Sequence, residues 1–166
     1  MIRAAALALL LAGCVAAEAP VRESAAVGMT ADGRGLQPNG TPLRIDFGRD
    51  EPGAVRAAAK LIGANPTERV VLEECGAGPM VSVRWANGFA MNFQYADFVG
   101  WSSEKKAGTP VAGTSGLQPG TPREALVGAT FRQTTLGEEF TSGEVSGLVE
   151  GGEVRMIWAG TTCFFR

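Results

Sequence analysis

The pattern that most constrains the fold of this chain lies in residues 89–95. Apolar side chains occupy every second position, and small or polar side chains occupy the positions between them. The apolar set comprises Phe89, Met91, Phe93 and Tyr95. A period of two places this set on one face of a β-strand, and the preceding Asn87-Gly88 pair favours a tight turn between antiparallel strands. The segment therefore predicts a half-buried strand in an antiparallel sheet.

Short runs of β-branched and aromatic residues recur along the chain, separated by Gly, Asn and Pro. Runs of this kind are typical of β-strands bounded by turns. The further predicted strands are 70–74, 80–85, 98–101, 131–135, 144–149, 154–158 and 162–165. Gly151 and Gly152 predict a hairpin turn between two of them.

Another hairpin is predicted near the start of the folded region. Leu36 leads into Asn39-Gly40, a pair that tolerates positive φ at a turn. Apolar and charged residues then alternate through 43–47, which predicts one buried face and one exposed face. The buried face comprises Leu43, Ile45 and Phe47.

The clearest helix pattern begins at Asp50. Asp50 and Glu51 place acidic side chains at the helix start, where free N–H groups favour negative charge. One face of the helix then carries small and apolar residues, namely Val55, Ala58, Ala59 and Ile62. Gly63 ends the helix, and Pro66 prevents its continuation.

A second, shorter helix is predicted over 121–127. Thr121 and Glu124 have the spacing of a capping box, Pro122 suits the first helical position, and Gly128 can end the helix. A helix followed by antiparallel strands thus occurs twice. This order predicts an α+β fold of two helix-plus-antiparallel-sheet halves, consistent with a degenerate tandem repeat.

Composition divides the chain into five predicted segments. Residues 1–13 form a signal peptide, 14–30 a lipidated flexible tether, 31–103 the first α+β half, 104–116 a linker and 117–166 the second α+β half. The tether is Ala-rich and has no sustained apolar period, as in mobile segments. The linker is rich in Gly, Lys and small hydroxyl residues, which are typical of loops.

The segment Leu11-Ala12-Gly13-Cys14 closes an N-terminal export signal. Arg3 precedes an apolar run that is too short to span a bilayer. The four residues resemble the lipobox of bacterial lipoproteins. The resemblance implies a lipid anchor, including palmitate, on Cys14 and a place in the cell envelope. Because no Asp follows Cys14, it also implies attachment to the outer membrane on the periplasmic side.

Ordinary signal cleavage after Ala17 is the open alternative to lipid attachment. The mature chain would then begin at Glu18 and carry no lipid. That chain would be a soluble periplasmic protein of the inhibitor type. No later segment of the sequence is apolar for long enough to cross a membrane, so any membrane attachment depends on Cys14.

Cys75 and Cys163 are the cysteines left once Cys14 is assigned to the lipid. An even pair in an exported chain predicts a disulfide, because the extracytoplasmic compartment is oxidising. The bond would close a loop of about ninety residues and stabilise the fold by about 4 to 5 kcal/mol in the chain-entropy model. Two buried free thiols are the alternative.

A family resemblance is found around the first predicted helix. Gly48, Ala54-Val55, Leu61-Ile62-Gly63 and Pro66 resemble the signature of the group that contains the SmpA/OmlA outer-membrane lipoproteins and the β-lactamase inhibitor proteins. Residues 120–125 match the start of this signature again, without the later Pro and about one turn of helix. The resemblance implies a helix packed on an antiparallel sheet and a protein-binding role in the envelope.

The sequence contains no histidine, and this absence limits the chemistry available to the chain. Catalytic arrangements that need imidazole are excluded, and a zinc site would lack its commonest ligand. The net charge of −2 and the mixed charge pattern argue against nucleic-acid binding. We therefore expect no enzyme activity, no metal and no cofactor. A hydrolase that uses only carboxylates is the alternative, and it requires two facing acids.

Aromatic residues on the predicted strands have two interpretations. Trp85, Phe98, Trp101 and Trp158 form either an exposed binding patch or part of the core. With catalysis disfavoured, the predicted function is a non-enzymatic protein-binding or scaffold domain that is lipid-anchored in the envelope. Its expected partner is another envelope protein, and the oligomeric state is left unassigned.

Overall fold

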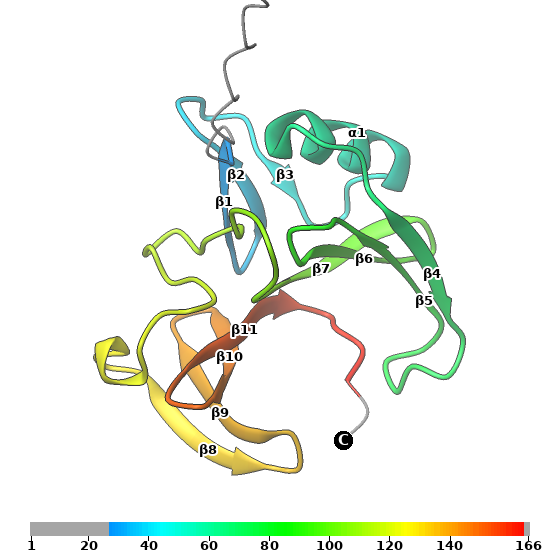
Figure 1. The fold of residues 1–166 in the computed structure, drawn as a ribbon. Helices are drawn as coiled ribbons and strands as arrows, with labels where there is room; N and C mark the ends of the chain where they lie inside the picture. Colours follow the sequence, from blue (N-terminus) through cyan, green and yellow to red (C-terminus); the bar gives the residue numbers. More distant parts are fainter. Residues whose placement is uncertain (1–26, 165–166) are drawn as a thin grey trace, which may run out of the picture.

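The computed structural model describes residues 27–164, and within that range the chain forms two antiparallel sheets and one α-helix (Figure 1). The predicted signal peptide, Cys14 and most of the predicted tether lie outside the described residues. The fold is therefore rich in β-structure, and the prediction of two balanced α+β halves is only partly correct. One helix and antiparallel pairing are present, but the second helix is not.

A three-stranded sheet opens the described chain, in the order β1 (Met29–Asp32), β2 (Gly35–Pro38) and β3 (Ile45–Asp46). Strand β1 begins inside the segment predicted as a tether, and Met29 is buried there. The predicted hairpin joins β2 to β3, but its loop is longer than Asn39-Gly40 alone. Leu43 falls in this loop and is 75% exposed, so its predicted burial is wrong.

The larger sheet has eight strands in the order β4-β5-β6-β7-β11-β10-β9-β8. The strands are β4 (Glu68–Leu72), β5 (Met80–Arg84), β6 (Phe89–Gln94), β7 (Asp97–Glu104), β8 (Thr130–Thr134), β9 (Gly137–Ser142), β10 (Val145–Glu150) and β11 (Glu153–Gly160). Strands β7 and β11 pair directly, with Trp101 opposite Ala159. The two predicted halves therefore share one continuous sheet.

Most predicted strands of this sheet are observed within a few residues, with two differences. Strand β9 was not predicted, because the acidic pair Glu138-Glu139 interrupts its apolar pattern. The predicted strand at 162–165 is not observed in the described part, since residues 162–164 belong to no strand.

Helix α1 (Glu51–Ile62) forms as its sequence predicts. The side chain of Asp50 accepts a hydrogen bond of 2.8 Å from the backbone N–H of Gly53, which satisfies one of the free donors at the helix start. At the other end Gly63 adopts the left-handed conformation, with φ of 76°. Ala54 and Ala58 face the core and let the helix lie close to the sheet.

The predicted second helix is wrong, because only a single 3-10 turn, η1 (Arg123–Ala125), forms there. The Thr121 hydroxyl accepts a hydrogen bond from the Gln118 N–H instead of capping a helix. The Arg123 guanidinium makes two hydrogen bonds to Glu138, of 2.8 and 2.7 Å. Because Val127 is 91% exposed, a longer helix at this position would gain no apolar burial.

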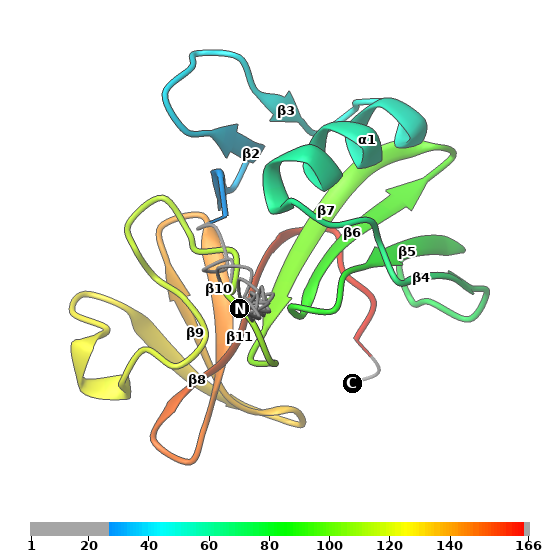
Figure 2. The same ribbon diagram turned by 45° about the horizontal axis from the view of Figure 1, so that its top comes forward.

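The two faces of the larger sheet differ in what covers them (Figure 2). Helix α1 and the small sheet pack on one face, where Trp101 donates its indole N–H to the Asp32 carbonyl at 2.8 Å. Val111 and Leu117, from the segment between β7 and β8, belong to the same core. The other face carries the C-terminal residues 161–164, which we call the tail. This second face holds a polar groove, and the turn between β6 and β7 lies at one end of its strands.

Candidate functional site

The tail is fixed across the second face of the sheet by backbone and side-chain contacts. Gly160 adopts a positive φ of 72°, which turns the chain at the end of β11. Thr161 donates its N–H to the Val99 carbonyl at 2.8 Å, and the Asn92 amide donates to the Thr161 carbonyl at 3.2 Å. Because Gly100 has no β-carbon, the tail can approach β7 closely.

The far end of the tail is held by a disulfide and an aromatic contact. Cys163 lies at disulfide distance from Cys75, with Cα atoms 5.5 Å apart, in agreement with the pairing expected from the sequence. The rings of Phe164 and Trp158 meet edge to face, with centroids 4.8 Å apart. The tail therefore ties β11 to the loop between β4 and β5.

A groove of about 240 Å³ lies between the tail and strands β5, β6 and β7. Its polar lining consists of Ser82, Arg84, Asn92, Ser102, Glu104 and Lys106 from the strands and the residues after them, and Thr162 from the tail. Hydroxyl and amide groups can hold a polar ligand in such a groove by hydrogen bonds.

The charged side chains of this groove are paired with one another or with neighbours. Arg84 lies 3.2 Å from Glu68, and Glu104 lies 3.4 Å from Arg155 and 3.6 Å from Lys106. Glu104 is also the one carboxylate among the described residues that line the groove. The two facing acids that a carboxylate-only hydrolase needs do not occur there.

The four aromatic residues considered as a binding patch are buried, namely Trp85, Phe98, Trp101 and Trp158. The interpretation as an exposed patch is therefore wrong, and these residues belong to the core. Trp85 donates its indole N–H to the Ala64 carbonyl at 3.0 Å, and Trp158 is covered by Phe164 from the tail. Burial of this kind satisfies the polar end of an indole while removing its apolar surface from water.

Among the aromatic residues of the described range, Tyr95 is the exposed one, with 98% of its surface accessible. It lies at the turn between β6 and β7, where Tyr95 has φ of 52° and Ala96 has φ of 68°. Two successive positive φ angles suit an Asn-Gly pair and disfavour residues with side chains such as these. The sequence pattern placed Tyr95 on the buried face, but β6 ends at Gln94 and its register shifts between Asn92 and Phe93.

Neighbouring segments hold this turn in place. Ala96 accepts a 2.8 Å hydrogen bond from the N–H of Glu51 at the start of α1, and Phe98 donates its N–H to the Arg49 carbonyl at 2.8 Å. The Gln94 side chain donates to the Ala77 carbonyl at 2.8 Å. The exposed ring of Tyr95 therefore projects from a backbone that is fixed on two sides. We call residues 94–97 the Tyr95 turn.

Several exposed acidic residues lie in or next to the segments that contact the Tyr95 turn. Asp97 is exposed, and it forms a β-bridge with Asp50, whose side chain is 64% exposed. Glu73 and Glu74 lie in the loop between β4 and β5, which is at the same end of the strands as the Tyr95 turn. Arg49 lies 3.5 Å from Asp50 and offsets part of this negative charge. The surroundings are thus acidic on balance.

Among residues 27–164, no group of three or more Cys, Asp or Glu side chains is arranged to hold a metal ion. No helix in the described range has the length and apolar character needed to cross a bilayer. No protein-family model, curated protein or solved structure matches the chain. The resemblance to the group of SmpA/OmlA lipoproteins and β-lactamase inhibitor proteins therefore stays a prediction.

Proposed function

We propose that this chain is a lipid-anchored protein of the bacterial cell envelope that binds another protein and catalyses no reaction. The lipobox pattern at Cys14 supports attachment to the outer membrane on the periplasmic side. The Tyr95 turn supports the binding role, and it is the observation on which the proposal depends.

The backbone of the Tyr95 turn is strained. A non-Gly residue in the left-handed region costs about 1 to 2 kcal/mol, and the turn contains two in succession. An Asn-Gly pair would reduce this cost, because both residues tolerate positive φ better than Tyr and Ala do. Strain of this kind is concentrated at functional sites. We therefore interpret the unfavourable residue at position 95 as one that serves binding.

The chemistry of tyrosine fits a protein partner. A tyrosine ring offers a large rigid contact area with one polar end, and tyrosines are enriched among residues that dominate binding energy. A cationic side chain can also stack on the ring. Asp97 lies two residues from Tyr95 and forms a β-bridge with Asp50, so the partner that we propose has a basic complementary surface.

Photo-crosslinking in intact cells tests this proposal. A benzophenone amino acid replaces Tyr95 in one strain and Val127 in a control strain, since Val127 is 91% exposed but lies in the segment before β8, at the other end of the strand order from β4 and β5. We expect one discrete crosslinked protein from position 95 and none from position 127. Identical products from both positions, or no product from either, would contradict the proposal.

Mass spectrometry of the mature chain distinguishes the lipid-anchored form from the soluble alternative. Lipid attachment predicts a chain that begins at Cys14 and carries the added mass of acyl groups. Cleavage after Ala17 predicts a chain that begins at Glu18 without lipid. The crosslink at position 95 should also weaken in a Cys14→Ser strain, because the anchor brings the domain close to an envelope partner.

A further inference from the structure

The described chain begins beside helix α1. Gly28 donates its N–H to the Leu61 carbonyl at 2.9 Å, and Asn39 donates its N–H to the Gly28 carbonyl at 2.9 Å. The chain therefore enters the fold between the last turn of α1 and loop 39–44. Figure 1 shows α1 and the small sheet on one side of the molecule and the tail, drawn in red after β11, on the other. We call loop 39–44 and the exposed side of α1 the entry surface.

A mainly apolar groove of about 410 Å³ runs along the entry surface. Leu43 lines it from the loop, and Ala57, Lys60 and Leu61 line it from the helix. Leu43 is 75% exposed and lies at the rim of this groove. The groove and Leu43 together leave apolar surface in contact with water beside the point of chain entry.

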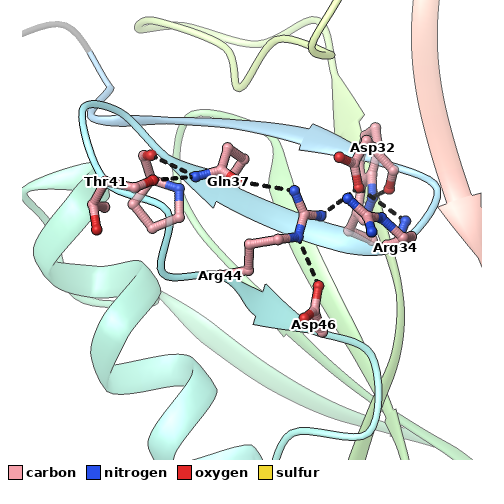
Figure 3. A network of polar contacts seen from close by, with 8 residues as sticks. Asp32, Arg34, Gln37, Thr41, Arg44 and Asp46 are labelled. Carbon is pink, nitrogen blue, oxygen red and sulfur yellow. Dashed lines mark hydrogen bonds and ion pairs between the residues drawn. The ribbon is translucent and has the colours of Figure 1, made fainter.

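A network of hydrogen bonds and ion pairs holds loop 39–44 in this position (Figure 3). Gln37 donates its amide to the Thr41 carbonyl at 2.6 Å, and Arg44 donates to the Gln37 side chain at 3.0 Å. Arg44 also bonds Asp32 and Asp46, each at 2.7 Å. Since the residues on both sides of Leu43 are fixed, its exposure is set by the fold and is not that of a free loop.

After the first turn of α1, the charged residues of the entry surface are all basic. Residues 52–67 contain Arg56 and Lys60 and no acidic residue, and residues 39–43 contain no charge. Both cations are exposed. The ion pairs found within residues 27–164 involve neither of them. Arg56 and Lys60 are thus available to an anionic surface.

We infer that the entry surface binds an anionic phospholipid bilayer, with Leu43 in the headgroup region and Arg56 and Lys60 facing the lipid phosphates. Exposed apolar residues flanked by Lys and Arg are typical of proteins that lie on a membrane surface. The twelve residues 15–26 separate Cys14 from Val27, and an extended chain of that length spans about 40 Å at most. An anchor on Cys14 therefore keeps this surface close to the bilayer. The inference takes from the proposed function only the lipid anchor on Cys14, and it does not depend on the binding role of Tyr95.

Vesicle sedimentation of the unlipidated protein tests the inference without relying on the anchor. The probe is the chain from residue 14 onward with Cys14→Ser, mixed with vesicles of phosphatidylglycerol and phosphatidylethanolamine or with phosphatidylcholine vesicles. We expect binding to the anionic vesicles that weakens with added salt. Lys60→Gln should reduce the partition coefficient about fivefold, the equivalent of about 1 kcal/mol for one basic residue near an anionic surface.

Matched variants separate the surface from general effects. Leu43→Asp should abolish most vesicle binding, whereas Val127→Asp and Lys105→Gln should leave it unchanged, because both residues lie outside the entry surface. Circular dichroism confirms that each variant is folded. Equal binding to both vesicle types, unchanged binding of Leu43→Asp, or no binding at all would overturn the inference.

Size-exclusion chromatography tests the competing occupant of this groove, a second copy of the chain. A dimer that Leu43→Asp converts to a monomer would overturn the inference, whereas a monomer throughout supports it. Failure of the proposed lipid anchor would be detected separately, by mass spectrometry of a mature chain that carries no lipid on Cys14. Vesicle binding by the unlipidated probe does not depend on that result.

Discussion

The carbonyl oxygen of Thr161 lies so close to Gly100 that a β-carbon on Gly100 would sit 2.1 Å from it. Thr161 also donates its N–H to the Val99 carbonyl, so the tail rests on β7 at a residue without a side chain. The tail is therefore part of the folded structure and lies over the groove on the second face of the sheet.

Gly100→Ala should displace the tail and lower the free energy of unfolding by about 1 to 3 kcal/mol, because backbone atoms cannot move aside as a side chain can. Urea unfolding followed by tryptophan fluorescence measures this change. Gly76→Ala is the control, since no atom lies within 4 Å of a β-carbon at Gly76. Equal unfolding midpoints for the two variants would show that the tail does not pack on β7.

Removal of the disulfide should destabilise the protein strongly. Cys75 and Cys163 are separated by 88 residues, and in the chain-entropy model a bond closing a loop of that length contributes about 4 to 5 kcal/mol. The double variant Cys75→Ala/Cys163→Ala should lose most of this amount in urea unfolding, and its near-ultraviolet circular dichroism should change as Phe164 leaves Trp158. If alkylation of the unreduced native protein labels both thiols, the bond is absent.

Elements that depend on nearby residues could be predicted from the sequence. Helix α1 is the clearest case, because Asp50 caps its start and Gly63 ends it within a short stretch of chain. The turn at Asn87-Gly88 likewise carries its own signal. In such segments the residues that decide the conformation are close neighbours, so pattern and structure agree.

Features that depend on distant residues were not predictable in the same way. Tyr95 continues an alternating pattern, but the turn there is fixed by contacts with α1 and with the loop after β4. In place of the predicted second helix, the Arg123 N–H donates to the Gly152 carbonyl and the Thr121 carbonyl accepts from the Val154 N–H, and both partners are distant in the chain. The pairing of β7 with β11 joins strands far apart in the chain, and local periodicity carries no information about it.

The lining of the candidate groove was only partly foreseeable. Cys75 and Cys163 were expected to pair, because an exported chain with two remaining cysteines favours a disulfide. The polar residues Ser82, Asn92 and Ser102 come together only because β5, β6 and β7 are neighbours in the sheet. An alternating strand shows that such residues share a face, but the face of the neighbouring strand depends on register.

Tyr95→Gly should affect stability and binding in opposite directions. Relief of the left-handed strain should raise the free energy of unfolding by about 1 kcal/mol, because glycine adopts positive φ at no steric cost. Loss of the ring should reduce chemical crosslinking to the partner in intact cells. Ala96→Gly is the matched control, since it relieves the neighbouring strain but keeps the ring. A loss of stability in Tyr95→Gly would contradict the interpretation of strain.

Ser103→Ala should stabilise the protein. The Ser103 hydroxyl is fully buried and has no hydrogen-bond partner among the described residues. Leaving a buried donor unsatisfied costs about 1 to 3 kcal/mol, and removal of the hydroxyl recovers part of this cost. We expect a gain of about 1 kcal/mol in urea unfolding, and no comparable gain from Ser102→Ala on the opposite face of the same strand. A loss of stability in Ser103→Ala would indicate that the hydroxyl is bonded.

The contact of Asp32 with Arg44 should make stability depend on pH. Burial raises the pKa of the Asp32 carboxyl, but the hydrogen bond from Arg44 and the backbone N–H of Arg34 outweigh it, so this pKa lies below its ordinary value of 3.8. A carboxyl with a lowered pKa in the folded state stabilises the protein above its unfolded pKa. That stabilisation is lost as the pH falls through the folded value.

Asp32→Asn should therefore lower the free energy of unfolding at pH 7 by about 1 to 2 kcal/mol, since it removes a charge-assisted hydrogen bond. The difference from the native protein should stay constant down to the ordinary pKa of 3.8 and shrink below it, as Asp32 of the native protein becomes protonated. Urea unfolding at a series of pH values measures this difference. The exposed Asp97→Asn serves as the control, with little change at any pH. If the free energy of unfolding of Asp32→Asn stays lower than that of the native protein by the same amount at pH values far below 3.8, the prediction is wrong. The shape of the side chain, and not its charge, would then stabilise the network around Arg44.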